Sequence, residues 1–169
     1  MIRQAVRIAD GVITNWLSAE DVKQVAAVVR DEAHKIGKDP SAFPILCRIS
    51  VSATGEARAR EQFRRAVAAY LNVPVYRTFH QWLGRGDALA EMNARWDAGD
   101  RRGGLAAVPG RAPGELAVFG RPEEGRDKIA RYVENGVTVP ILNFMNLETE
   151  PAARAAESRA MLQALAPTP

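Results

Sequence analysis

Strand-like segments alternate with helical ones along this chain, and that order limits the fold more than any other feature. Residues 44–53, PILCRISVSA, place apolar and polar side chains at alternate positions, as a β-strand with two different faces does. Residues 12–16 and 138–146 also have the pattern of short strands, and helical patterns lie between the three segments. Because strands joined through helices pair in parallel, the sequence predicts an α/β fold with a parallel sheet.

The alternating pattern also predicts what each strand face carries. In the strand over 44–53 the apolar face is predicted to consist of Ile45, Cys47, Ile49, Val51 and Ala53. The opposite face is predicted to carry Leu46, Arg48, Ser50 and Ser52. The shorter segment 12–16 is predicted to be a buried strand.

Local signals mark where the helices begin and end. Ser18 is a good N-cap with Asp21 at the N3 position, where a capping box prefers Glu or Gln, and Gly37 is placed to end that helix. Its apolar stripe is predicted to be Val22, Val25, Ala26, Val29, Ala33 and Ile36. Further helices are expected over 55–71, 87–98 and 122–136, and from Pro151 onward. The stripe of helix 55–71 is predicted to be Ala59, Phe63, Val67 and Tyr70. The Gly/Pro/Arg-rich residues 99–115 are expected to form a loop.

Composition excludes several classes of protein. The chain has 169 residues, the length of one ordinary domain, with a formal net charge of +3 and one cysteine, Cys47. Basic and acidic residues are interspersed, so no nucleic-acid-binding stripe is predicted. A lone cysteine excludes an internal disulfide and is typical of a reducing compartment. No signal-peptide pattern and no apolar run of about 18 residues is present, which predicts a cytoplasmic protein without a membrane segment.

Three strands are too few for a complete parallel structure. They cannot close a barrel, and a parallel sheet needs cover on both of its faces. The chain is therefore expected to be part of something larger.

The carboxyl ends of the strands are where a parallel barrel places its site. The candidates there are Thr14, Asn15, Trp16, Ser50, Ser52, Asn143, Phe144 and Asn146. The alternative is that these are ordinary residues of strand-to-helix loops, where Asn and Ser are common. Arg48 lies mid-strand on the polar face, so it must reach solvent or find a partner. It either binds an anionic group or pairs with a carboxylate of another strand.

Other clusters give weaker signals. Tyr76, Phe79, His80 and Trp82 could line an apolar pocket or a subunit contact, although an aromatic core patch explains them as well. Neither histidine has a second ligand at metal spacing, so no metal site is predicted. The segment 101–104, Arg-Arg-Gly-Gly, could bind phosphate but lacks the strand before it and the helix after it that such loops have.

The segments ADGVITNWLSAEDV, AAYLNVPVYRTFHQWLG and LAVFGRPEEGRDKIARYVENGVTVPIL, in this order, resemble luciferase-like flavin or deazaflavin oxidoreductases. The resemblance implies the C-terminal portion of a TIM-type (β/α)8 barrel of the bacterial luciferase-like class, with about three strands and a helical insertion. Residues 1–169 would form a single partial barrel domain. The pattern is most similar to members that use coenzyme F420, such as methylenetetrahydromethanopterin reductase, with flavin mononucleotide (FMN) as the alternative cofactor.

The resemblance implies hydride transfer or monooxygenation on a small organic substrate, with the cofactor supplying the chemistry. The predicted cofactor- or substrate-binding residues are Thr14, Asn15, Trp16, Arg48, Ser50 and Asn143, while no catalytic residue is identified. Asn15 would hydrogen-bond substrate or ring, and Trp16 would wall the pocket. In the family the glycine-rich phosphate loop follows the fifth strand, so this chain is expected to be incomplete as an enzyme. Glu115 and Ser18 stand where sugar-phosphate-oxidising relatives have basic residues, which argues against such a substrate.

Two alternatives stay open. The chain could be a non-catalytic half-barrel that dimerises as a binding or assembly module, because open strand edges and an apolar inner face favour association. The expected partner is then a second copy or a complementing half-barrel. It could also be a self-contained open sheet that binds a small anion at its strand ends.

Overall fold

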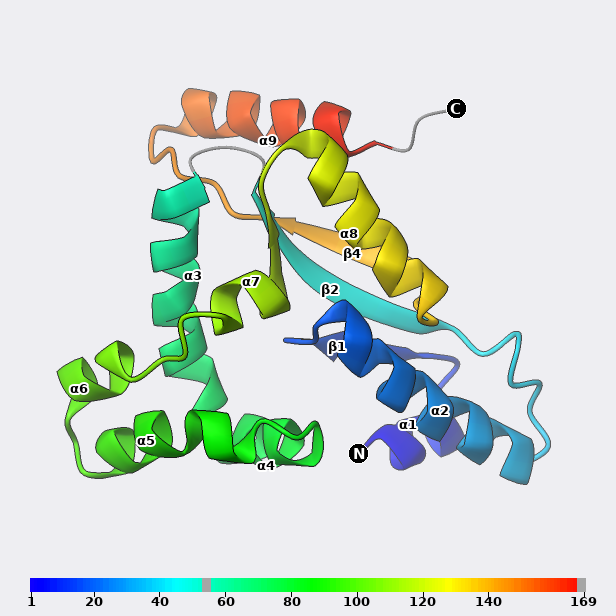
Figure 1. Cartoon of the computed structure of the whole chain (residues 1–169). Coiled ribbons are helices and arrows are strands. Elements are labelled where there is room, and N and C mark those ends of the chain that lie inside the picture. The colour runs from blue at the N-terminus through cyan, green and yellow to red at the C-terminus, as the bar shows by residue number, and fades with distance from the viewer. Residues whose placement is uncertain (53–55, 167–169) are drawn as a thin grey trace. The chain divides into compact units, whose positions relative to one another are not determined.

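The computed structural model describes residues 1–52 and 56–166 and has the expected α/β architecture, with a parallel sheet whose strands are separated by helices along the chain (Figure 1). The chain divides into two compact units. The first consists of Met1–Glu56 and Glu115–Pro169, and the second of Ala57–Gly114. The first unit holds the whole sheet, so it also holds the strand ends where the candidate residues lie.

The sheet has four parallel strands, one more than predicted. They are β1 (Val12–Asn15), β2 (Ile45–Ser52), β3 (Ala117–Phe119) and β4 (Val139–Phe144). β4 pairs with Leu46–Val51 of β2, β1 pairs with Ile45–Arg48, and β3 pairs with Ser50–Ser52. A residue can have one partner on each side, so β1 and β3 must share one edge of β2 while β4 occupies the other.

The first unit contains four helices among its described residues. They are α1 (Ile2–Ile8), α2 (Ala19–Lys35), α8 (Pro122–Glu134) and α9 (Pro151–Leu165). Three of them begin and end close to the predicted positions, and α1 was not predicted. At the start of α2 the Ser18 hydroxyl accepts from the Asp21 N–H, and the Asp21 carboxylate accepts from the Ser18 N–H, so Asp completes the capping box. Gly37 follows α2 with a positive φ of 74°, as predicted for a terminating glycine.

Buried polar contacts fix α8 and α1 against α2. The Tyr132 hydroxyl donates to the carbonyl of Leu17 at 2.8 Å, and the Asn135 amide donates to the carbonyl of Ala19 at 2.7 Å. Glu32 of α2 is almost fully buried and forms an ion pair with Arg7 of α1. The Tyr132 bond gives the Leu17 carbonyl a donor, and the ion pair gives the buried Glu32 carboxylate an opposite charge.

One face of the sheet is covered over β1, β2 and β3, whereas the opposite face is covered at β3, where Ala117 and Phe119 are buried, but not at β1. Val12, Ile45, Cys47, Ile49 and Val51 are buried, and α2 and α8 lie side by side over the sheet (Figure 1). The prediction of a buried strand over 12–16 is therefore wrong for Ile13, which is 71% exposed because it points to the other face.

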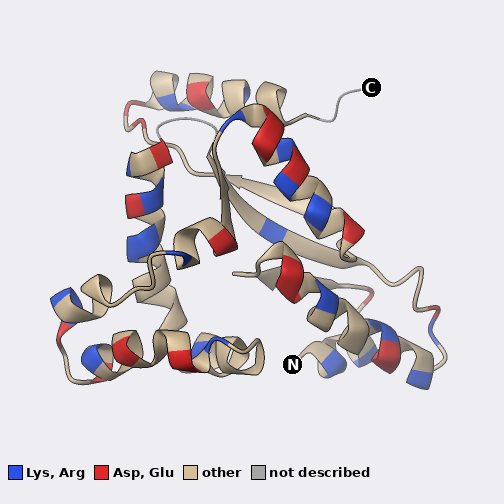
Figure 2. Cartoon of the chain, viewed as in Figure 1, with Lys and Arg blue, Asp and Glu red and all other residues tan. Residues whose placement is uncertain are grey.

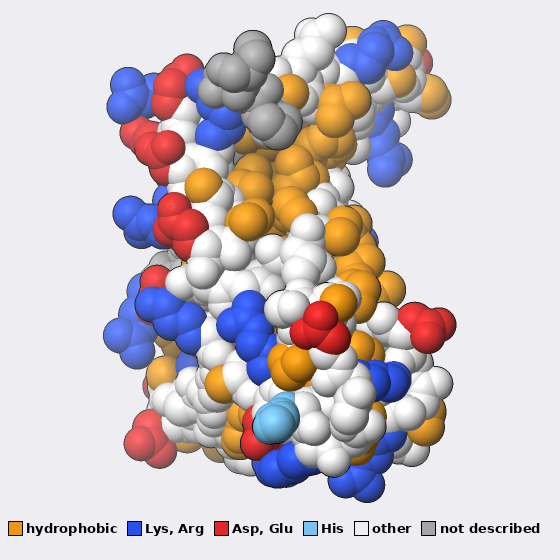
Figure 3. Space-filling view, turned by 90° about the vertical axis from the view of Figure 1, so that its right-hand side faces the viewer, with side chains coloured by type: hydrophobic (Ala, Val, Ile, Leu, Met, Phe, Trp, Pro, Cys, Tyr) orange, Lys and Arg blue, Asp and Glu red, His pale blue; other side chains and the backbone are white. Residues whose placement is uncertain are grey.

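Val139 and Ile141 of β4 are also exposed, at 46% and 36%. They share the face of Ile13, because the register sets them opposite Leu46 and Arg48 of β2. We call this surface the open face. Figure 3 shows, in one side view of the molecule, apolar side chains gathered between charged groups.

The second unit is helical. It contains α4 (Pro74–Trp82), α5 (Gly86–Asp97), α6 (Arg101–Ala106) and most of α3 (Glu56–Leu71) and α7 (Ala112–Leu116). Arg77 of α4 donates two hydrogen bonds to the Asp97 carboxylate of α5, at 2.8 and 2.9 Å.

Two predictions for this part of the chain are wrong. Residues 99–115 contain α6 and the start of α7, so they are not simply a loop. Tyr70 is 49% exposed, because the buried stripe of α3 turns instead through Ala68 and Leu71. Ala53 and Gly55, which were placed in a strand and a helix, lie outside the described residues.

Candidate functional site

Three of the predicted site residues form one hydrogen-bonded group on the open face. Arg48 Nη2 donates to Asn143 Oδ1 at 2.7 Å, and Asn143 Nδ2 lies 3.4 Å from Ser50 Oγ. Because Asn143 and Ser50 are register partners, their side chains stand next to one another across β2 and β4. The structure therefore brings Arg48, Ser50 and Asn143 together, and we call them the polar triad.

The polar triad lies toward the carboxyl ends of the strands. Arg48 is the register partner of Ile141, whereas Asn143 lies two residues further along β4. The bond to Asn143 therefore directs the guanidinium toward the carboxyl ends, where parallel α/β barrels place their sites. On the amino-terminal side, Ile13, Leu46 and Val139 form an apolar row across three strands.

Arg48 is the one charged residue in strands β1 to β4. Figure 2 shows the strands otherwise without basic or acidic residues, while charged side chains are frequent on the helices. Arg48 is exposed, and within residues 1–52 and 56–166 it forms no ion pair with a carboxylate. The predicted alternative of a carboxylate on a neighbouring strand is thus not realised among the described strands.

Thr14 lies on the opposite face from the polar triad. It is 9% exposed, pairs in register with Cys47, and its hydroxyl donates to the carbonyl of Leu46 at 3.0 Å. Burial in this layer raises the pKa of the Cys47 thiol to about 11, so the thiol is neutral at physiological pH. Thr14 and Cys47 are therefore part of the covered layer.

Asn15 and Trp16 shape the turn that leaves β1. Asn15 is the register partner of Arg48, and its Oδ1 accepts from the Trp16 N–H at 2.9 Å. Trp16 has a φ of 60°, which is uncommon for a residue other than glycine, and it is 8% exposed. Asn15 thus lies beside the polar triad at the strand end, whereas Trp16 is buried.

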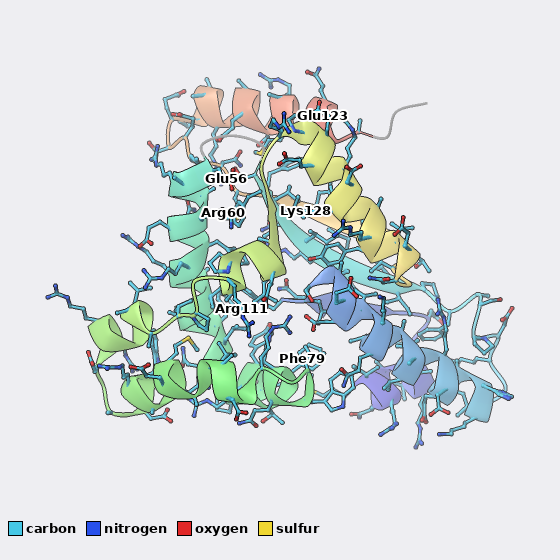
Figure 4. All side chains as sticks on the ribbon, viewed as in Figure 1. Glu56, Arg60, Phe79, Arg111, Glu123 and Lys128 are labelled. Atoms are coloured by element: carbon cyan, nitrogen blue, oxygen red, sulfur yellow. The ribbon has the colours of Figure 1, made fainter. Side chains whose placement is uncertain are left out.

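Sequence reasoning missed a cation near the end of β3. Lys128, labelled on α8 in Figure 4, donates from Nζ to the carbonyl of Phe119 at 3.3 Å. The strand itself was missed, because residues 117–119 are buried on both faces and show no alternation. If β3 had been predicted, the helical spacing after Pro122 would have indicated that Lys128 lies near the end of β3.

The remaining sequence candidates do not contribute to the polar triad. In the segment 101–104 the Gly103 N–H donates to the Asp100 carboxylate at 2.7 Å, and the Gly104 N–H to the Asp100 carbonyl at 2.8 Å. A phosphate would have to displace this cap, so the segment does not present a phosphate cradle. Phe79 and Trp82 stack on each other at 5.8 Å, and His80 is fully buried. The described residues include no group of three or more His, Cys, Asp or Glu side chains arranged to hold a metal.

Residues 1–139 match the family described as luciferase-like monooxygenase. The chain belongs to this family. The match includes β1, β2 and β3 and reaches the start of β4. A comparison with curated proteins gives no match.

Two solved structures are similar in fold to this family member. Coenzyme F420 dependent tetrahydromethanopterin reductase from Methanopyrus kandleri has a TM-score of 0.69 at 18% identity, over 93% of this chain and 45% of that chain. An F420-dependent secondary alcohol dehydrogenase, solved with an F420-acetone adduct, has a TM-score of 0.61 at 17% identity, over 98% and 46%. The chain therefore spans less than half the length of either enzyme. This agrees with the predicted fold class, a portion of a luciferase-like barrel.

No described helix is both long enough and apolar enough to cross a membrane.

Proposed function

We propose that this chain forms part of the catalytic barrel of an oxidoreductase that uses coenzyme F420, with FMN as the alternative cofactor. Support comes from the family match over residues 1–139 and from two F420-dependent enzymes of similar fold. Residues 1–169 are then one partial barrel domain, with the helical second unit as an insertion between β2 and β3. The expected location is the cytoplasm.

The observation that carries this proposal is the open face. It combines an apolar row with the polar triad near the strand ends, which suits a wall that contacts a flat ring and a small substrate. Bound there, the cofactor would accept a hydride from a substrate carbon or donate one to it. Arg48, Ser50 and Asn143 would orient the reactants, and Ile13, Leu46 and Val139 would exclude water from beneath them.

The proposed roles of the β1 residues are smaller. Asn15 uses Oδ1 for the Trp16 N–H, which leaves its amide nitrogen to donate to a ligand at the strand end. Trp16 would support the wall from behind, and Thr14 would hold β1 against β2 through its bond to Leu46.

The Gly103–Gly104 amides are already bound, so another segment would have to hold the cofactor's phosphate. We therefore propose that activity requires further barrel strands that cover the open face. The exposed Ile13, Val139 and Ile141 support such a cover, since side chains of this kind are normally buried in a parallel sheet.

Cofactor titration tests the proposal. F420 and FMN are added separately to this chain alone and to a protein that contains it with five further barrel strands, and binding is followed by cofactor fluorescence. We expect tight binding only by the completed barrel, with F420 preferred. Tight binding by the chain alone would contradict the need for further strands, and no binding by the completed barrel would contradict the oxidoreductase proposal.

The second candidate is a non-catalytic half-barrel that dimerises through the open face. The 71% exposure of Ile13 favours it, because burying such side chains drives association. Ile13→Lys should then convert a dimer into a monomer in light scattering after gel filtration. Ile36→Lys, at the exposed end of α2, is the matched control and should leave the mass unchanged. A wild-type monomer would exclude this candidate.

A further inference from the structure

Arg48 is held in a defined direction on the open face, with most of its donors unused. A guanidinium has five N–H donors, and Arg48 uses one of them for Asn143. No carboxylate among the described residues forms an ion pair with it. Several donors of one guanidinium edge are therefore available to a ligand.

Asn143 determines where this edge points. Its amide has a defined orientation, because Oδ1 accepts from Arg48 while Nδ2 faces the Ser50 hydroxyl. The guanidinium is therefore held toward the carboxyl ends of β2 and β4, away from the apolar row at the amino-terminal side. A residue that only formed an ion pair deep inside a barrel would not need this direction.

Covering the open face would make an anion at Arg48 necessary. When the face is closed off from water, an unpaired guanidinium loses its hydration, and a hydrogen bond to a neutral amide does not compensate the charge. The ligand or the covering strands must then supply a negative group. The direction of the guanidinium toward the strand ends favours the ligand.

The surroundings of Arg48 indicate which anion fits. Phosphate sites are usually built from several backbone N–H groups or several cations, whereas the polar triad has one charge and a neutral amide. A planar guanidinium edge matches the two oxygens of a carboxylate. Ile141, the register partner of Arg48, lies beside it on the same face and provides apolar contact for the rest of the ligand.

We propose that Arg48, positioned by Asn143 and Ser50, binds the carboxylate of a small organic acid whose apolar part packs on Ile141. This inference rests on the proposed function in taking that acid as the substrate. The binding step does not need the cofactor, so it can be tested on this chain separately from cofactor binding.

The test is an NMR titration of the isotope-labelled chain with benzoate, which combines a carboxylate with an apolar ring. Benzamide, its neutral analogue, and inorganic phosphate are the comparison ligands. The readout is the Nε–H resonance of Arg48, together with the methyl resonances of Ile141. We expect saturable shifts with benzoate, with affinity at least ~10-fold higher than for benzamide or phosphate.

Three variants separate the proposed role from general effects. Arg48→Gln should weaken benzoate binding by about 10-fold or more. Asn143→Asp keeps the arginine but sets a carboxylate beside it, so it should abolish the response to benzoate. Arg58→Gln removes another exposed arginine, in the second unit, and should bind benzoate as the wild type does. A folding control is the methyl spectrum of the covered layer, which should be unchanged in all three.

Several results would overturn the inference. These are equal binding of benzoate and benzamide, unchanged binding in Arg48→Gln or Asn143→Asp, and a preference for phosphate. If the Arg48 resonance responds to protein concentration but not to benzoate, a second copy of the chain covers the residue and the assignment is wrong. Failure of F420 and FMN to bind the completed barrel would instead contradict the proposed function and leave a measured benzoate site in place.

Discussion

Replacing Gly136 by alanine should destabilise the first unit far more than the same change at Gly37, although both glycines follow a helix. Gly136 ends α8 with a φ of 119°, and Gly37 ends α2 with a φ of 74°. Side chains strain the backbone at both positions. They differ in space, because a Cβ at Gly136 would lie 2.9 Å from Ala26 Cβ, whereas nothing lies within 4 Å of one at Gly37.

The expected magnitudes follow from these two terms. Backbone strain at an unfavourable φ costs about 1–3 kcal/mol, and both variants carry it. Forcing an extra methyl group into a packed contact costs about 1–3 kcal/mol more, and only Gly136→Ala carries that cost. We therefore expect Gly136→Ala to lower the free energy of unfolding by about 2–6 kcal/mol and Gly37→Ala by about 1–3 kcal/mol.

Urea unfolding followed by tryptophan fluorescence measures both values. Adding Ala26→Gly to Gly136→Ala removes the opposing methyl group. The second substitution itself costs about 1 kcal/mol, because it places a glycine inside a helix. Once that cost is subtracted, the double variant should regain the stability that the close contact removes from Gly136→Ala. If the two alanine variants are equally destabilised, or if Ala26→Gly gives no recovery, the close approach of α8 to α2 at this point is not what makes Gly136 necessary.

Three further predictions concern buried groups of the first unit. Tyr132→Phe should lower the free energy of unfolding by about 1–2 kcal/mol, because the Leu17 carbonyl loses its donor; chemical denaturation tests this. Glu32→Gln should cost about 1–3 kcal/mol and raise hydrogen exchange in α1, because the ion pair with Arg7 is lost; exchange confined to other elements would contradict it. The folded Cys47 thiol, with its pKa raised from 9.0 to about 11, contributes stability that is present below pH 9 and is lost as pH rises to 11. Over that range the wild type should lose about 2–3 kcal/mol more than Cys47→Ala in pH-dependent unfolding, and parallel curves would refute this.

The sequence predicted β2 and α2 well because each has a regular period and a clear end. The alternation through residues 45–51 corresponds to the covered and open faces, and Ser18 and Gly37 bound α2 as expected. β3 was missed because a strand of three residues that are all buried has no period to detect. Asp100 caps the start of the glycine-rich segment, so residues that were expected to form a loop form α6 instead.

Some features of the site could not be predicted from the residue pattern alone. Alternation separated Arg48 and Ser50 from Cys47, but it could not tell which face the helices would cover. Thr14 and Asn15 are neighbours in the sequence, yet a period of two sends them to opposite faces. The bond between Arg48 and Asn143 spans 95 positions, so only the strand register, which the sequence does not state, could have predicted it.

The pairing of β3 with the end of β2 makes the helical second unit separable from the sheet. The chain leaves the sheet at Ser52 and re-enters it at Ala117, and these residues lie within the same parallel pair. Because β2 and β3 run parallel, the connection from Ser52 to Ala117 must cross back along the sheet, which takes about a dozen residues or more. The intervening helices can thus be replaced by a different domain of at least that length, without changing any strand pairing of the sheet.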